Sequence, residues 1–405
     1  MSTDWNLIEL ADLGVLRFRG VDAVKFLQGQ VSNDVERLTA ERSQLAGYHN
    51  PQGRVIALLR LVQLAPDDAL AILPRELVAT VASRLMKFVL RAKVKIADDS
   101  TAWKVAGLVA PHAGTAGAGR VSAASSSGAG ASGAGSGASD KLSPETAAEF
   151  EARATSWAAT QFQQASAAAA TAGELSLAAA QLEVAESVVP LPTVSALILP
   201  DTVHSQSLAG GTVIIRTGAT PARWLVLSPA GETAPLAGCV AADRDVWRLL
   251  DIADGEAQVY TATSEEFVAQ MLNLDALDAI AFDKGCYTGQ EVIARAHYRG
   301  RVKRRLQRLV SRGVAAKLTV GATGQLTDGR AFKVVEAVQL EDGRCEFLAV
   351  APMVAGTTSG GTEAISSDAG AQAGSSDGPT ANAVPTTSTP VLDAEVLPLP
   401  YPLPE

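Results

Sequence analysis

The stretch Asp283-Lys284-Gly285-Cys286-Tyr287-Thr288-Gly289-Gln290-Glu291 places one thiol just before a strong helix-start signal. Thr288 followed three residues later by Glu291 has the spacing of a capping box, in which each side chain binds the backbone N–H of the other residue. The pattern predicts a helix from Gly289 to about Tyr298, with Gly300 as its terminator.

Cys286 would then lie two residues before the cap, near the positive end of the helix dipole and beside Lys284. The helix dipole and the Lys284 ammonium would both favour the thiolate form of Cys286 over the thiol form. The alternative is the usual state of a free cysteine, a small buried hydrophobic residue in a structural motif. The coincidence of thiol, lysine, two glycines and cap favours a functional site. Cys286 and Lys284 are therefore the candidate catalytic residues.

Cysteine is scarce in this chain, which has only Cys239, Cys286 and Cys345 in 405 residues. No CxxC pair and no Cys/His cluster occurs, so the chain by itself cannot supply four thiolates to a cluster or a structural zinc. We expect no intrinsic metal or iron–sulfur cluster. Isolated cysteines, an N-terminus without a signal-peptide pattern and apolar runs too short to span a bilayer predict a cytoplasmic protein without a membrane partner.

Two low-complexity segments, 113–139 and 356 to about 390, are nearly all small or polar residues and are predicted to be disordered. An Ala-rich helix is expected over about 144–170. The remaining pattern is α+β. It predicts helices at 21–28 and from Pro74 onwards, with Leu77, Val81, Leu85 and Phe88 on its apolar face. It also predicts strands at 55–64, 69–73, 93–97 and 102–110, a hairpin at 212–216 and 224–227, and a small antiparallel barrel from about 304–310, 331–340 and 344–352.

Several runs together resemble one known family. Phe267–Asp275, Lys284–Glu291 and Ala294-Arg295-Ala296 resemble the signature of YgfZ-type folate-binding proteins, relatives of the glycine-cleavage aminomethyltransferase and of a mitochondrial iron–sulfur assembly factor. Shorter supporting matches are Gly20–Ala23, Phe26–Gln30, Asn33–Val35, Pro51–Arg54 and Leu397–Tyr401. The likeness covers roughly 1–112 and 194–352, with the last ten residues.

The resemblance implies a three-part cloverleaf of the aminomethyltransferase type around a central opening, with a C-terminal antiparallel β-barrel as the third part. The corresponding domains would be a folate-binding α+β core at 1–112 and 191–300, a low-complexity, partly helical insertion at 113–190, the barrel at 301–352 with 391–405, and a disordered segment at 353–390.

The resemblance also implies that the chain binds a reduced folate, tetrahydrofolate, and helps to make or maintain iron–sulfur enzymes, including tRNA-modifying ones, through Cys286. Its partners would be those enzymes or assembly proteins. Trp247 matches a tryptophan of the folate site and could stack a folate ring or simply belong to the core. A second such tryptophan, expected near Leu13, is absent. The predicted folate-binding residues are Trp247, Tyr287, Gln290, Glu291 and Arg295.

One departure from the aminomethyltransferases concerns the stretch Asn50–Ile56, which in those enzymes leads into paired aspartates. Here it leads into Ala57 and Leu58. Aliphatic side chains cannot move a proton, so glycine cleavage is not expected. A folate-dependent one-carbon transferase or demethylase, using Cys286 or Glu291, stays open as an alternative. Whether the protein turns over a substrate is left undecided.

Positive charge is concentrated near the motif although the formal net charge of the whole chain is −9. Residues 283–312 hold nine Lys or Arg against two acids, Asp283 and Glu291. The dense part consists of Arg299, Arg301, Lys303, Arg304, Arg305 and Arg308. A folate glutamate tail, a phosphate backbone, an acidic protein or plain solvent would each fit such a face. If part of this cluster lies on a strand, alternate side chains point to opposite faces, so only some of these cations could contact one ligand. Direct tRNA binding is possible, but no RNA-binding motif in the sequence supports it.

Overall fold

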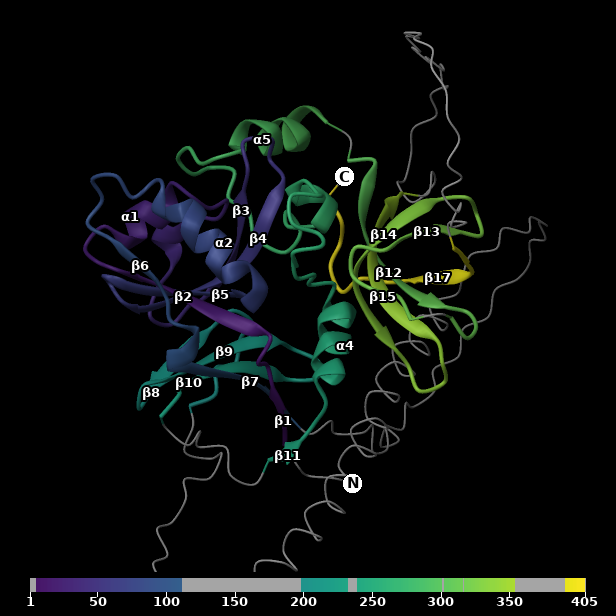
Figure 1. The fold of residues 1–405 in the computed structure, drawn as a ribbon, viewed down its shortest axis with the longest axis horizontal. Helices are drawn as coiled ribbons and strands as arrows, with labels where there is room; N and C mark the ends of the chain where they lie inside the picture. The colour runs from purple at the N-terminus through teal and green to yellow at the C-terminus, as the bar shows by residue number, and fades with distance from the viewer. Residues whose placement is uncertain are drawn as a thin grey trace, which may run out of the picture.

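The computed structural model describes residues 5–110, 198–231, 239–300, 302–315, 317–353 and 390–404. The helix expected over about 144–170 and the low-complexity segments that follow Ala113 and Gly356 lie outside these ranges. The described residues form three lobes, two built on open sheets and one on a barrel, and helix α4 (Arg244–Asp254) stands where they meet (Figure 1).

The first lobe is a five-stranded antiparallel sheet in the order β3-β4-β5-β2-β6. Its strands are β2 (Leu13–Arg19), β3 (Gln44–His49), β4 (Val55–Ala65), β5 (Asp68–Pro74) and β6 (Lys95–Asp98). Helix α2 (Arg75–Met86) packs on one face through Leu77, Val81 and Leu85, as its periodicity predicts. Phe88 was also expected on that face, but it follows the helix end and is exposed. The short helix α1 (Ala23–Gln28) and the 3₁₀ turn η1 (Val35–Arg37) connect β2 to β3.

The second lobe is a six-stranded sheet in the order β11-β1-β7-β10-β9-β8. Its strands are β1 (Asn6–Glu9), β7 (Trp103–Val109), β8 (Gln206–Ala209), β9 (Thr212–Gly218), β10 (Arg223–Pro229) and β11 (Val240–Ala241). The predicted hairpin is confirmed as β9 and β10. Alternate residues such as Leu225 and Leu227 face the first sheet and share one core with its Val62 and Ile72. The two sheets therefore pack face to face.

The barrel is one six-stranded sheet whose two edges are joined by the C-terminal segment. Its strands are β12 (Arg304–Ser311), β13 (Thr323–Leu326), β14 (Ala331–Gln339), β15 (Cys345–Pro352), β16 (Val391–Leu392) and β17 (Ala394–Leu397). Strand β16 pairs with β13 and, two residues later, β17 pairs with β12 at the opposite edge. The predicted antiparallel barrel is thus confirmed, with one short parallel pair where it closes.

Helix α4 links the second lobe to the barrel. Its Asp243 cap accepts from the N–H of Asp245, and Gly255 ends it in the left-handed conformation, with φ of 65°. Val246 and Leu250 enter the core between the sheets, whereas Ile252 joins the large core that reaches the barrel. The remaining helical segments are η2 (Ser100–Ala102), η4 (Ala269–Leu272) and α5 (Gln290–Arg299).

Candidate functional site

The loop from Phe282 to Gly289 leads into α5 and presents the Cys286 thiol to solvent. Cys286 is exposed, and a Cβ atom built on neighbouring Gly285 would have no atom within 4 Å. Cys345 is buried in the barrel and Cys239 is half-buried. Of these three thiols, only that of Cys286 is open to a large partner.

Lys284 turns away from the surface and fastens this loop to the first lobe. Its Nζ donates to the carbonyl oxygens of Gln28, Val31 and Asn33, each at 2.7 Å. An ammonium group has three N–H donors, so all are used. Burial lowers the pKa of Lys284 to about 8. The structure therefore gives Lys284 an anchoring role in place of the predicted contact with the thiol.

Helix α5 begins at Gln290, close to the prediction, but the capping box is not formed. The cap residue is Gly289, with φ of 85°, and no side chain caps the helix. The turn from Asn50 to Gly53 lies against it, where a Cβ on Gly289 would be 2.6 Å from the Asn50 oxygen. Glu291 instead points into solvent, with 88% of its side chain exposed, and pairs at 3.4 Å with Arg295. Tertiary contact with the turn has replaced the local cap.

Tyr287 points inward from the motif into a buried polar layer. Its ring centre lies 5.2 Å from the Lys284 ammonium and 6.2 Å from the ring of His49. His49 is buried, and neither of its ring nitrogens has a side-chain partner among the described residues. Burial lowers the pKa of His49 to about 3. Gln290 donates to the carbonyl of Lys284 at 3.4 Å, so it supports the loop from the helix side.

Trp247 is a core residue, which corrects its predicted role in stacking a folate ring. It is 4% exposed and packs between α4 and the second sheet. The Arg223 guanidinium lies 4.8 Å from its ring centre, and the ring fills the space beside Gly107. Both the helix and the strand would have to move before another ring could stack there.

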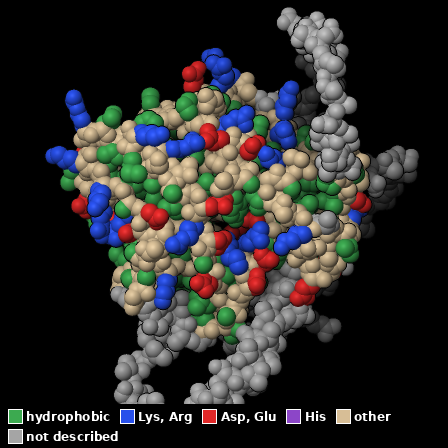
Figure 2. Space-filling view, in the orientation of Figure 1, with side chains coloured by type: hydrophobic (Ala, Val, Ile, Leu, Met, Phe, Trp, Pro, Cys, Tyr) green, Lys and Arg blue, Asp and Glu red, His purple; other side chains and the backbone are tan. Residues whose placement is uncertain are grey.

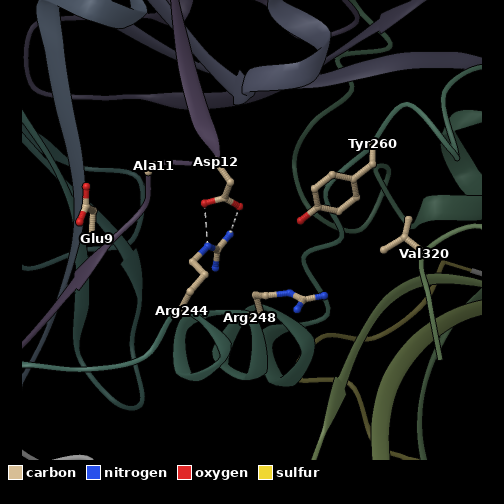
Figure 3. A pocket seen from close by; sticks show the side chains of 7 residues that line it. All are labelled: Glu9, Ala11, Asp12, Arg244, Arg248, Tyr260 and Val320. Carbon is tan, nitrogen blue, oxygen red and sulfur yellow. Dashed lines mark hydrogen bonds and ion pairs between the residues drawn. The ribbon is translucent and has the colours of Figure 1, made fainter. Parts of the chain in front are cut away.

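The opposite face of α4 borders a cavity of about 430 Å³ at the junction of the three lobes (Figure 3). Its lining residues come from the end of β1 and the β1–β2 connection, from α4, from the segment after α4 and from the segment between β12 and β13. They are Glu9, Ala11, Asp12, Arg244, Arg248, Tyr260 and Val320. Acidic and basic side chains gather around the hollowed middle of the molecular face in Figure 2. The volume is within the range of about 300–1,000 Å³ common for small-molecule sites.

Arg244 is the least satisfied cation of this cavity. Its Nε and Nη2 each donate to the Asp12 carboxylate at 2.8 Å, while Nη1 is buried without an acceptor among the described residues. Burial opposes its charge, but the Asp12 carboxylate, together with Asp251 and Tyr260, outweighs burial and raises the pKa of Arg244. Glu9 adds an exposed carboxylate to the lining of the cavity.

Glu336 of β14 fixes the other polar wall. It accepts from Arg248 and, at 2.7 Å, from the hydroxyl of Tyr260. Burial and this carboxylate raise the pKa of Tyr260, which keeps the phenol protonated. Arg248 also donates to Asp245 at 2.8 Å. Arg248, Tyr260 and Glu336 are held in place by these hydrogen bonds, so they have little capacity to bind another charged group.

Six of the sequence-predicted site residues lie at the start of α5: Cys286, Lys284, Tyr287, Gln290, Glu291 and Arg295. The seventh, Trp247, lies in the core. None of the seven lines the cavity. Arg244 and Arg248 do line it and were missed. They stand four residues apart on α4, on the polar face opposite Val246 and Leu250, and that spacing was their only signal in the sequence.

Two members of the basic cluster are neutralised inside the protein. Arg305 is buried against Asp275 at 2.9 Å, and Arg308 is buried against Glu346 at 2.8 Å. They stand three residues apart on β12 and so lie on opposite faces of the strand. Arg299 at the end of α5 and Lys303 before β12 are exposed. Arg301 lies outside the described residues.

The described residues contain no group of three or more His, Cys, Asp or Glu side chains arranged to hold a metal ion. In the same ranges, no helix is long and apolar enough to cross a membrane.

Comparison with known proteins identifies relatives over most of the chain. No protein-family model matches the sequence. The tRNA-modifying protein YgfZ of Serratia proteamaculans is 28% identical over 349 residues, covering 84% of this chain and 82% of that protein. The protein of the same name from Yersinia pseudotuberculosis is 27% identical over equal shares.

A solved structure confirms the predicted fold. The glycine cleavage system aminomethyltransferase T from Bartonella henselae superposes with a TM-score of 0.53, covering 86% of this chain and 79% of that one, at 12% identity. At that identity the likeness concerns the fold alone. The chain is thus similar to the YgfZ proteins over most of its length and has the three-part fold of the glycine-cleavage aminomethyltransferases.

Proposed function

We propose that this protein is a folate-binding accessory factor that supports iron–sulfur enzymes of tRNA modification through Cys286. The observation that carries the proposal is the cavity at the lobe junction, where the buried Nη1 of Arg244 lacks an acceptor. The name of the relatives, tRNA-modifying protein, supports placing the chain in that process.

The cavity suits a reduced folate by chemistry and size. A pterin ring offers N–H donors to a carboxylate such as Glu9 and a carbonyl oxygen to Arg244, and folate carries anionic carboxylates at its other end. Ala11 and Asp12 line the cavity next to Leu13, the position near which the resemblance placed a folate-site tryptophan. Arg244, Glu9 and Tyr260 would hold the ligand, and when bound it would supply one-carbon or redox chemistry.

Cys286 would serve a second ligand, a protein or its cluster. The thiol stands at an open loop that Lys284 and Gln290 hold from below. A single exposed cysteine suits a transient contact with a cluster or an oxidised group better than permanent storage, which takes several ligands.

Aminomethyl transfer is not part of the proposal. Ala57 and Leu58 occupy the positions at which the resemblance places paired aspartates, and both are buried in the middle of β4. No proton can be accepted there.

Calorimetric titration of the purified protein with tetrahydrofolate tests the folate site. We expect saturable binding, weakened roughly tenfold or more in Arg244→Met because a charged hydrogen bond to the ligand is lost. Arg295→Met removes an equally cationic but exposed arginine outside the cavity and should bind like the wild type. Failure of the wild-type protein to bind any reduced folate would overturn the proposal.

Complementation of cells lacking the gene tests the role of the thiol. Cys286→Ala should bind folate normally yet fail to restore an iron–sulfur tRNA-modifying enzyme, whereas Cys239→Ala should restore it. Turnover of a one-carbon donor by the purified protein, lost in Cys286→Ala, would instead favour the transferase or demethylase. Full restoration by Cys286→Ala would leave the motif with a structural role only.

A further inference from the structure

Three aromatic rings meet on the outer face of α5, beside the loop that carries Cys286. Phe282 of the loop stacks on His297 of α5 with centres 3.8 Å apart and planes within 16°. Tyr298 meets these rings edge-on, at 6.1 Å from Phe282 and 4.7 Å from His297. Its own side chain is 68% exposed. Tyr298 is therefore a positioned ring that faces water.

Two exposed cations follow this ring in the chain. Arg299 is the next residue of α5, and Lys303 lies just beyond the helix end. The two neighbouring acids are each paired, Glu291 with Arg295 and Asp283 with Arg37. Arg299 and Lys303 thus give the face its uncompensated charge within the described residues.

The stack of Phe282 on His297 has a structural role, because it holds the Cys286 loop against α5. Tyr298 adds little to it, since most of the ring stays in water. An exposed, positioned aromatic ring next to unpaired cations is the arrangement with which proteins bind single-stranded nucleic acid, the ring stacking a base and the cations meeting phosphates. An apolar partner helix would leave Arg299 and Lys303 desolvated without counter-charges.

We infer that this face, defined by Phe282, His297, Tyr298, Arg299 and Lys303, binds a single-stranded segment of RNA. A base would stack on Tyr298, and neighbouring phosphates would pair with Arg299 and Lys303. The inference rests on the proposed role in tRNA modification and deepens it by naming where the RNA is held. It places the RNA next to the loop of Cys286 and away from the folate cavity.

Fluorescence anisotropy with an unmodified tRNA transcript and with oligouridylate measures this binding. We expect Tyr298→Ala to weaken binding roughly tenfold and Tyr298→Phe to keep it, because stacking needs the ring and not the hydroxyl. Arg299→Gln and Lys303→Gln should each reduce the slope of log affinity against log salt by about one.

Matched controls come from other exposed residues of the same types. Phe88→Ala removes an exposed ring beyond α2, and Arg312→Gln removes an exposed arginine of the barrel; both should bind RNA like the wild type. Equal RNA affinity of Tyr298→Ala and wild type would overturn the inference. Absence of RNA binding by a wild-type protein that still binds tetrahydrofolate would overturn it too, while leaving the folate site intact. Loss of an acidic protein partner, with RNA binding unchanged, would assign the face to that protein and count against RNA.

Discussion

Lys284 and Cys286 stand two residues apart in the motif, but their side chains point in opposite directions. Lys284 is drawn inward because three backbone carbonyls converge on its ammonium, whereas Cys286 stays in water. Beneath them, His49 is buried, and its ring nitrogens have no side-chain partner among the described residues. Burial disfavours a charged imidazole, so this layer opposes protonation of His49.

His49 should make the protein sensitive to acid. Its pKa is about 3 in the folded protein and near 6.5 when unfolded, so below pH 6.5 only the unfolded chain takes up the proton. Stability is complete above pH 6.5 and falls with pH toward 3. Between about pH 7.5 and about pH 5 the expected loss is roughly 2 kcal/mol from this group. His204, with a pKa lowered to about 4 by burial, acts in the same direction.

Denaturant unfolding of His49→Leu at both pH values measures the effect. The variant should lose less stability on acidification than the wild type. Identical pH dependence of the two proteins would contradict the burial of His49.

At the scale of elements, sequence periodicity located most helices and strands correctly. It succeeded for α2, for the β9–β10 hairpin and for the barrel strands, because apolar spacing reports which face is buried. It failed at the cap of α5, since Thr288 and Glu291 satisfy a local rule that the turn at Asn50 overrides. Contacts between segments more than 200 residues apart leave no local pattern.

Gly289→Ala should destabilise the protein by about 1–3 kcal/mol, because alanine is strained at φ of 85° and its Cβ would meet the Asn50 turn. Gly285→Ala, four residues earlier, has open space around the new Cβ and should be nearly neutral. Thermal unfolding of the two variants compares them directly. Equal stability of both would show that the close approach at Gly289 is absent.

For the whole molecule, the C-terminal segment connects the barrel to the helix at the lobe junction. It closes the barrel through β16 and β17, and then Tyr401 donates to the carbonyl of Gly255 at the end of α4 at 2.8 Å. Asn273 donates to the Tyr401 hydroxyl at 3.4 Å. One short segment thus fixes the barrel against the helix that lines the cavity.

Truncation before Val391 should open the barrel and expose the edges of β12 and β13, which favours aggregation. Size-exclusion chromatography and thermal unfolding would show a loss of monomer and of stability. Tyr401→Phe should cost about 1 kcal/mol, the value of one hydrogen bond, and truncation after Pro402 should be mild because Tyr401 remains. A monomeric, equally stable product of the longer truncation would contradict this role of the segment.

The sequence by itself determined the family resemblance, the α+β class, the barrel and the choice of the loop around Cys286 as a candidate site, because motif residues and apolar periodicity are local properties of the chain. Only the tertiary structure decided that Trp247 is core, that Lys284 anchors the loop, and that Arg244 borders the cavity. Each of these depends on which distant segment packs against the residue. In the Asp283–Glu291 stretch, the spacing of Thr288 and Glu291 predicted a helix start. The packing of Asn50 and Gly53 against Gly289 determined the conformation of that start.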